Sequence, residues 1–215
     1  MSDPLSFARS FVSAFRRPAS HSEPVRRKPV FLADIVVSSG EQLKEQLLAQ
    51  GLAPSEVLLK YCWPRYAPPK EAGIASMPKS ENLRAQFERL VEMHGVAPSG
   101  FPMPVGTVRS TNGEFVGYIL EYVPGVTLES ILAGGMFEEA RRQLEAVEAT
   151  VAKLHTKALA HGDLNPSNII AADDGRTLLI DPVPHPGGGR LLQDDICLEA
   201  LRRRIDEAFP APPAG

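Results

Sequence analysis

The chain has few cysteines and lacks the long apolar run of a membrane-spanning protein. Its 215 residues include only two cysteines, Cys62 and Cys197, which are far apart and match no metal-ligand spacing. This sparse usage gives no basis for a disulfide framework and fits a reducing compartment. No apolar run reaches the roughly 20 residues that a membrane span requires, and the N-terminus lacks the apolar core of a secretory signal. We therefore expect a cytoplasmic protein.

Charged residues are unevenly distributed along the chain. The net charge is only −3, so nothing global indicates a nucleic-acid-binding protein. Residues 1–29 are nevertheless basic, and within them residues 5–17 place Phe7, Phe11 and Phe15 on one arc of a helix. This segment has three interpretations: contact with a membrane surface, docking on its own domain or on a partner, and part of an export signal. A peripheral membrane location and secretion as an effector therefore stay open.

The order of apolar and turn-forming segments predicts an α+β chain in two lobes. Strands are expected at 30–37, 56–63, 105–110 and 115–123, helices at 41–51, 82–95, 127–132, 137–159 and 194–208, and two short strands between 169 and 181. The dipeptide Asn112-Gly113 predicts a tight hairpin. The expected organisation is a basic tail and linker at 1–29, a small β-rich N-lobe at 30–120, a hinge at 121–125, a minimal helical C-lobe at 126–209 and a tail at 210–215.

Three polar residues near the predicted short strands suggest phosphoryl transfer. Asp163 and Asn168 lie five residues apart in a loop, and Asp181 ends a strand further on. Phosphoryl transfer needs oxygen ligands for Mg²⁺ and a carboxylate near the attacking hydroxyl. Asp163 is the candidate to orient that hydroxyl and accept its proton, and Asn168 and Asp181 are the candidate metal ligands.

The stretch His161-Gly162-Asp163-Leu164 followed by Asn168 resembles the catalytic loop of the protein-kinase-like superfamily, and Ile180-Asp181 resembles its metal-binding strand end. The glycine after the histidine makes the loop more similar to those of RIO-type kinases, lipopolysaccharide kinases and aminoglycoside phosphotransferases. The resemblance covers roughly residues 30–200. It implies a two-lobed protein-kinase-like fold that binds ATP and Mg²⁺.

The resemblance also implies roles for residues outside this loop. Val57 to Lys60 look like the strand whose lysine contacts the α- and β-phosphates, which makes Lys60 a catalytic and cofactor-binding candidate. Glu88 is the best candidate to pair with Lys60, although two other glutamates of the same helix compete for this role. The backbone groups of Glu121 and Val123 look like the hinge that hydrogen-bonds adenine.

Further along the chain, Asp195 falls where related small kinases have an aspartate that hydrogen-bonds the backbone of the catalytic loop.

The sequence departs from the family where the glycine-rich loop should lie. Ser38-Ser39-Gly40 and a helix stand there instead. A helix N-terminus offers free N–H groups to phosphate, and the serines add hydroxyl donors, so these three residues are candidate phosphate ligands. Degraded nucleotide binding, or a need for a partner, is the competing interpretation.

The leading hypothesis is a minimal Ser/Thr protein kinase that transfers the γ-phosphate of ATP to a hydroxyl. Only 34 residues follow Asp181, and this short C-lobe favours a macromolecular acceptor, which we expect to be a protein. A small-molecule, sugar or lipopolysaccharide kinase is the alternative enzyme. A pseudokinase that binds nucleotide without turnover is the second alternative, although a binding module has no need of Lys60, Asp163, Asn168 and Asp181 together.

Overall fold

The computed structural model describes residues 33–36, 40–49, 51–52, 57–61, 79–184 and 189–208. The predicted basic tail at 1–29, with its amphipathic segment 5–17, lies outside these residues. So do Ser38 and Ser39 of the predicted phosphate loop and the tail at 210–215.

The chain divides into two compact units. Unit 1 comprises residues 1–87 and 103–122, and unit 2 comprises residues 88–102 and 123–215. The chain passes from unit 1 to unit 2 between Tyr122 and Val123, inside the segment predicted as a hinge. The second half of the helix at 79–96 is grouped with unit 2, whereas the sequence suggested an unbroken N-lobe from 30 to 120.

Unit 1 contains a four-stranded sheet in the order β1-β3-β4-β2. The strands are β1 (Ala33–Val36), β2 (Val57–Tyr61), β3 (Pro104–Arg109) and β4 (Phe115–Glu121). The predicted hairpin is confirmed between β3 and β4, where Gly113 takes φ +79° and its N–H donates to the Ser110 carbonyl at 2.9 Å. A glycine fits this position because it adopts positive φ at no steric cost.

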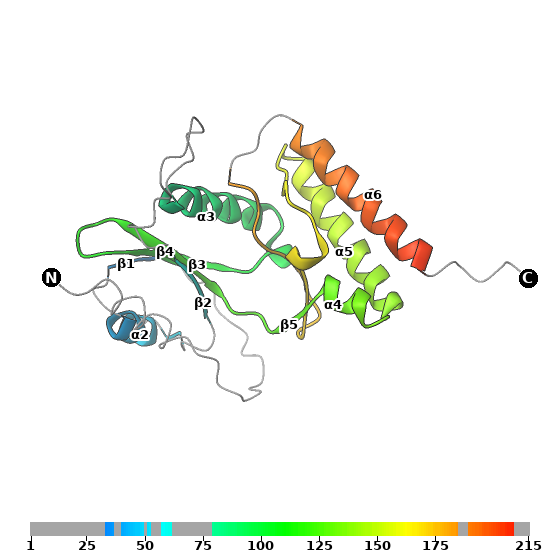
Figure 1. Ribbon diagram of the computed structural model, residues 1–215. Coiled ribbons are helices and arrows are strands. Elements are labelled where there is room, and N and C mark those ends of the chain that lie inside the picture. Colours follow the sequence, from blue (N-terminus) through cyan, green and yellow to red (C-terminus); the bar gives the residue numbers. More distant parts are fainter. Residues whose placement is uncertain are drawn as a thin grey trace, which may run out of the picture. The chain divides into compact units, whose positions relative to one another are not determined.

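Two helical segments contribute to the packing of unit 1. Helix α2 (Gly40–Ala49) buries Leu43 and Leu47 in the apolar cluster that also contains Ile35 and Ile119 of the sheet. The first half of α3 (Lys79–Val96) places the ring of Phe87 5.1 Å from that of Tyr118. Figure 1 shows the sheet with these two helices.

The position of β1 was not predicted. β1 pairs in parallel with β3, with Val36 opposite Arg109, and β2 lies at the other edge of the same sheet. Three strand spacings of about 4.8 Å put β1 roughly 14 Å from β2. Parallel pairing requires a long connection, so local sequence signals could not reveal it.

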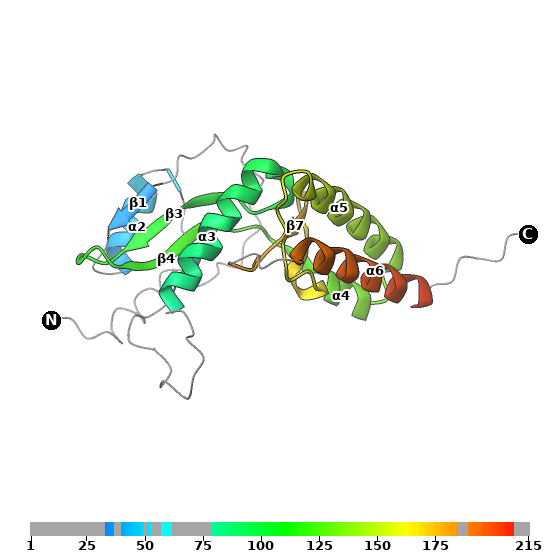
Figure 2. The same cartoon turned by 90° about the horizontal axis from the view of Figure 1, so that it is seen from above.

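Unit 2 combines a small antiparallel sheet with helices, so the predicted α+β fold class is confirmed. Its sheet has the order β5-β6-β7. Its elements are η2 (Pro98–Gly100), β5 (Gly125–Thr127), α4 (Leu128–Ala133), α5 (Phe137–His155), η3 (Pro166–Asn168), β6 (Ile169–Ala172), β7 (Thr177–Leu179) and α6 (Arg190–Ala208). Figures 1 and 2 both show α5 and α6 side by side, and their facing sides share one apolar core that includes Val151, Leu154, Leu198 and Leu201.

Helix α5 ends four residues before the predicted boundary. Ala158 takes φ +55°, and the Leu159 N–H donates to the Leu154 carbonyl at 3.0 Å, which is the bond that closes a Schellman-type helix end. Glycine normally marks such an end, and an alanine there gives no sequence signal. The break directs the chain toward the catalytic-loop segment.

Among the described residues, no helix is both long and apolar enough to span a membrane.

We expect Gly125→Ala to destabilise the protein by about 1–3 kcal/mol, because an added Cβ would lie 2.3 Å from the Ala171 carbonyl oxygen of the neighbouring strand. Gly95→Ala is the matched control, since its Cβ would meet nothing within 4 Å and alanine favours a helix by up to about 1 kcal/mol. Urea denaturation of both variants measures the difference. Equal midpoints would contradict the close approach of β5 to β6.

Candidate active site

The predicted catalytic residues Asp163 and Asn168 are hydrogen-bonded to each other. The side-chain amide of Asn168 donates to Asp163 Oδ2 and to the Asp163 carbonyl, both at 3.0 Å. Asp163 is exposed, so its carboxylate is accessible from solvent while one oxygen is fixed in direction. This arrangement suits a general base, which must be both accessible and oriented.

Asn165 stabilises the turn that separates these two residues. Its Oδ1 accepts hydrogen bonds from the backbone N–H groups of Ser167 at 3.0 Å and Asn168 at 3.2 Å, which caps the short helix η3. Its Nδ2 also donates to Asp163 Oδ1 at 3.3 Å. The sequence analysis assigned Asn165 no role, although an Asx residue before Pro166 is a recognisable turn signal.

The pairing of β6 with β7 in unit 2 brings Asn168, just before β6, and Asp181, just after β7, to the same end of the two strands. Ile169 pairs with Leu179 across the β6–β7 ladder, and the Ile180 N–H donates to the Asn168 carbonyl at 3.0 Å. Asp181 follows directly and takes φ +59°, a left-handed conformation that aspartate tolerates better than most residues but that still costs about 1–2 kcal/mol. The three residues singled out from the sequence therefore share one edge of one unit.

The donor set at this edge fits Mg²⁺. Because the Asn168 Nδ2 donates to Asp163, the amide oxygen of Asn168 faces away from that carboxylate, and the Asp181 carboxylate would be the second oxygen donor. Mg²⁺ in nucleotide sites binds one or two carboxylates plus phosphates and waters. In the part of the chain that the structure describes, no group of three or more His, Cys, Asp or Glu is placed to hold a metal by itself.

His161 is a buried structural residue of the loop. Its ring is fully buried, lies 6.5 Å from the ring of Phe101 and contacts the Ile180 carbonyl through Nε2 at 3.0 Å. Burial lowers the pKa of His161, although the nearby Asp194 carboxylate opposes this shift. A neutral imidazole must donate from Nε2 to this carbonyl, which leaves Nδ1 unprotonated. His161 therefore ties the catalytic loop to the residue before Asp181.

Asp194, not Asp195, anchors the catalytic loop. The two carboxylate oxygens of Asp194 accept the backbone N–H groups of His161 and Gly162, each at 2.7 Å. Asp194 is completely buried, whereas the Asp195 side chain is 61% exposed and lies 3.7 Å from the His155 ring. The expectation for Asp195 is wrong by one residue, which is about 100° around a helix.

The sequence contained a signal for Asp194 that was missed. Asp194 precedes Leu198, Leu201 and Ile205 by four, seven and eleven residues, and these four residues form the buried stripe of α6. A carboxylate on an apolar stripe must find hydrogen-bond donors in the core. Its helical phase therefore points to a buried, backbone-binding role.

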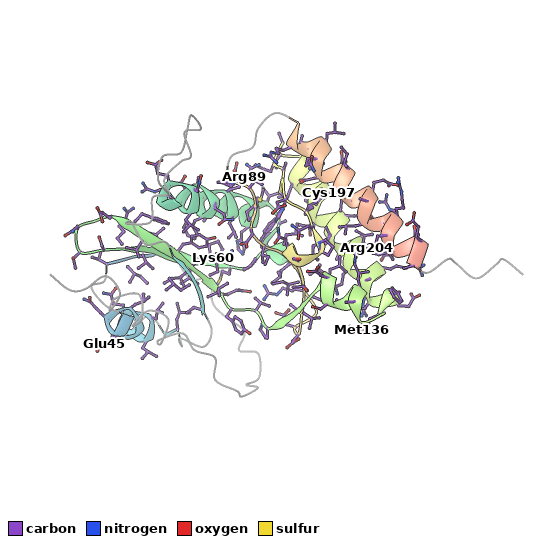
Figure 3. The ribbon with its side chains drawn as sticks, viewed as in Figure 1. Glu45, Lys60, Arg89, Met136, Cys197 and Arg204 are labelled. Atoms are coloured by element: carbon purple, nitrogen blue, oxygen red, sulfur yellow. The ribbon has the colours of Figure 1, made fainter. Side chains whose placement is uncertain are left out.

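Lys60 lies in β2 of unit 1, opposite Tyr118 of β4 (Figure 3). Burial lowers the pKa of Lys60 to about 8. An anion beside the ammonium group would favour the charged form.

The other predicted nucleotide ligands have different surroundings. The backbone N–H of Glu121 donates to the Met103 carbonyl at 2.9 Å and is therefore already used. Of the two backbone groups of Glu121, the carbonyl remains the predicted adenine contact. Val123 begins the unit 2 part of the chain. Glu88 is exposed on α3 and is grouped with unit 2, so its pairing with Lys60 stays a prediction.

Gly40 is the one residue of the predicted phosphate loop that the structure describes. Gly40 begins α2, which follows β1, and the sheet order places β1 and β2 at opposite edges. Val36 is also opposite Arg109, whereas Lys60 is level with Tyr118 in the middle of β4. The strand that precedes Gly40 and the strand of Lys60 thus lie at opposite edges of the unit 1 sheet, and a phosphate-binding role for Gly40 stays a prediction. The expectation for Ser38 and Ser39 concerns residues outside the described part.

We expect Asp194→Asn to lower the free energy of unfolding by about 1–3 kcal/mol and to reduce phosphoryl transfer, because the amide presents an N–H donor to one of the two loop N–H groups. Asp195→Asn is the matched control and should change both quantities little, since Asp195 is exposed. Thermal melting and initial rates measure the two effects. Equal effects of the two variants would contradict the anchoring role.

We expect the affinity for ADP to fall as the pH rises through the Lys60 pKa of about 8. The phosphates stabilise the charged ammonium, so binding is strong while Lys60 is protonated and weakens once the free protein loses that proton. The dissociation constant should be about ten-fold higher at pH 9 than at pH 7. Calorimetric titration at several pH values measures it, with Lys60→Met as the control that should show a flat profile. A wild-type profile as flat as that of Lys60→Met would rule out a phosphate contact.

Two comparisons with known proteins find similar proteins. Three solved structures of WbdD resemble the chain: a medium-resolution structure of the bifunctional kinase-methyltransferase, a crystal structure of the monomeric protein and a high-resolution crystal structure. Their TM-scores are 0.45, 0.44 and 0.43, and each is 20% identical over 74% of this chain. The chain spans only 34%, 36% and 35% of the length of these chains.

A family model described as the lipopolysaccharide kinase (Kdo/WaaP) family matches residues 127–182. The matched stretch runs from the start of α4 to the residue after Asp181, so it contains Asp163, Asn168 and Asp181. Lys60 and the hinge residues lie outside it. The match agrees with the prediction of a kinase and is nearer to the sugar or lipopolysaccharide alternative than to a protein kinase. The predicted resemblance to the protein-kinase-like superfamily is thereby confirmed, and residues 127–182 are similar to lipopolysaccharide kinases.

Proposed function

We propose that the protein is an ATP- and Mg²⁺-dependent phosphotransferase that phosphorylates a sugar hydroxyl of lipopolysaccharide. The observation that carries this proposal is the hydrogen-bonded pair Asp163–Asn168, which shares a sheet edge with Asp181 inside the stretch similar to lipopolysaccharide kinases.

Asp163 is the proposed general base. The acceptor hydroxyl oxygen attacks the γ-phosphorus of ATP, the bond between that phosphorus and the β,γ-bridging oxygen breaks, and ADP leaves. The hydroxyl proton passes to the Asp163 carboxylate, which the amides of Asn165 and Asn168 hold in one orientation. Orientation of this kind matters because phosphoryl transfer depends on positioning more than on covalent chemistry.

The proposed metal ligands are Asn168 and Asp181. When bound, Mg²⁺ would neutralise charge on the β- and γ-phosphates. Lys60 of β2 is the proposed contact for the α- and β-phosphates, as its resemblance to the strand lysine of protein-kinase-like proteins implies. The Glu121 carbonyl and the Val123 N–H are the proposed adenine contacts.

The family match reverses the order of the two acceptors considered from the sequence. The short C-lobe favoured a protein acceptor, but an argument from chain length is weaker than a match that covers the catalytic loop itself. The proposed donor, ATP, favours a cytoplasmic location, and a membrane contact through residues 5–17 would bring the protein close to a lipid-linked acceptor.

The proposal is tested by incubating the full chain with Mg²⁺ and γ-labelled ATP in parallel with lipopolysaccharide in detergent, free Kdo sugar, and a generic protein acceptor such as casein. We expect label in lipopolysaccharide, and we expect Asp163→Ala to lose at least 100-fold of this activity, since general-base catalysis typically contributes 10²–10⁴-fold.

Asp173→Ala is the matched control, because Asp173 lies in the turn after β6 and its backbone N–H bonds the Pro124 carbonyl. Its activity should match the wild type. Label in the protein acceptor alone would support a protein kinase instead. A rise in melting temperature with ATP but no label in any acceptor would indicate a pseudokinase.

A further inference from the structure

One buried arginine, Arg89 of α3, has no role in the proposed reaction. Arg89 is only 7% exposed, although its neighbour Glu88 is exposed. A buried guanidinium is costly unless it is paired and hydrogen-bonded. Its contacts therefore indicate what it does.

Arg89 makes one ion pair and one backbone hydrogen bond. Its Nη1 lies 2.9 Å from Glu92 Oε2, one turn along the same helix. Its Nη2 donates to the Ala160 carbonyl at 3.2 Å, 71 residues away in sequence. Ala160 directly precedes His161 of the catalytic loop. Arg89 is labelled on α3 in Figure 3.

The Ala160 carbonyl is the first of five consecutive backbone groups that receive a partner from another segment. The N–H groups of His161 and Gly162 donate to Asp194 of α6. The His161 carbonyl accepts from the Val183 N–H at 2.9 Å, and the Gly162 carbonyl accepts from Arg190 Nη1 at 3.3 Å. The segment from the Ala160 carbonyl to the Gly162 carbonyl, which we name the loop base, is therefore held from α3, from α6 and from the segment after β7.

The loop base needs such support because its backbone is unusual. Ala158 has φ +55° and Gly162 has φ +79°, so two residues close together adopt the left-handed region. At Gly162 even a Cβ atom would meet Val183 at 3.2 Å. Asp163 is the next residue, so a rotation in the loop base moves its carboxylate directly.

Packing alone does not account for an arginine at this position. Its Nε is buried and finds no acceptor in the described part of the chain, which is a cost that an apolar side chain of similar length would avoid. The positive charge also lies near His161, where it opposes the effect of Asp194 and helps to lower the pKa of the imidazole. An arginine and an aspartate thus hold the loop base from two different helices.

We propose that Arg89 is a positioning residue that fixes the Ala160 carbonyl and thereby sets the position of Asp163 for phosphoryl transfer. This inference rests on the proposed function. It assigns α3 a direct part in arranging the catalytic loop, besides the predicted pairing of Glu88 with Lys60.

The test compares Arg89→Met, which keeps the aliphatic stem but removes the donors, with Arg89→Lys, which keeps a charge and a donor. Arg141→Met is the matched control, since Arg141 makes a similar ion pair with Glu138 of its own helix, one turn away. All variants are assayed with Mg²⁺, ATP and lipopolysaccharide well below their melting temperatures. We expect kcat of Arg89→Met to fall at least ten-fold with KM for ATP within two-fold of the wild type, because small misplacements of catalytic groups cost up to about 100-fold.

Arg89→Lys should recover part of kcat, and Arg141→Met should retain the wild-type value. A folded Arg89→Met with unchanged kcat, or with a change in KM alone, would overturn the proposal. A loss of activity that follows only the unfolded fraction would also overturn it.

A second readout separates this inference from the proposed function. Amide hydrogen exchange of peptides covering residues 158–165 should be at least ten-fold faster in Arg89→Met than in the wild type and unchanged in Arg141→Met. If the wild type and Asp163→Ala both fail to label any acceptor, the proposed function fails and exchange alone decides the role of Arg89. Equal exchange in Arg89→Met and the wild type would then refute the contact.

Discussion

The conformation of the loop that leads to Asp163 in unit 2 depends on one buried carboxylate, that of Asp194. Asp194 accepts two adjacent backbone N–H groups at 2.7 Å from a position with no solvent exposure, so it holds the loop base by two charge-assisted bonds. Buried N–H groups must be paired, and no regular ladder can pair them in a segment that enters and leaves the left-handed region. The conformation of the loop before Asp163 is therefore defined by a helix that begins almost 30 residues later in the sequence.

The small sheet of unit 2 positions the other end of the loop, after Asp163. The β6–β7 register brings the end of the catalytic loop next to Asp181, and the His161 ring closes the connection by bonding the Ile180 carbonyl. β5 completes the sheet by pairing with β6, and its first residue, Gly125, lies in the segment 121–125 that was predicted as a hinge. Gly125 suits this pairing because its missing Cβ lets the two strands approach.

Two helices each place one charged side chain near His161 of the loop. Asp194 of α6 and Arg89 of α3 have opposite effects on His161: Asp194 raises the pKa of its imidazole and Arg89 lowers it. Burial is the largest effect and, like Arg89, lowers the pKa, so the imidazole is neutral and its Nε2 donates to the Ile180 carbonyl in a fixed tautomer. The loop is thus fixed by hydrogen bonds from polar groups that are buried in the apolar core. These hydrogen bonds are stronger than they would be in water, because the effective dielectric constant of the interior is low.

Local sequence indicated the candidate site residues, and tertiary structure determined which groups hold the loop that carries them. The spacing of Asp163, Asn168 and Asp181, the hairpin at Gly113 and the apolar stripes of the helices were all recognisable, because each depends on residues near in sequence. The parallel pairing of β1, the choice of Asp194 over Asp195 and the contact of Arg89 with Ala160 depend on groups up to 71 residues apart. No local pattern encodes such contacts, because they form only when separate helices and strands pack together.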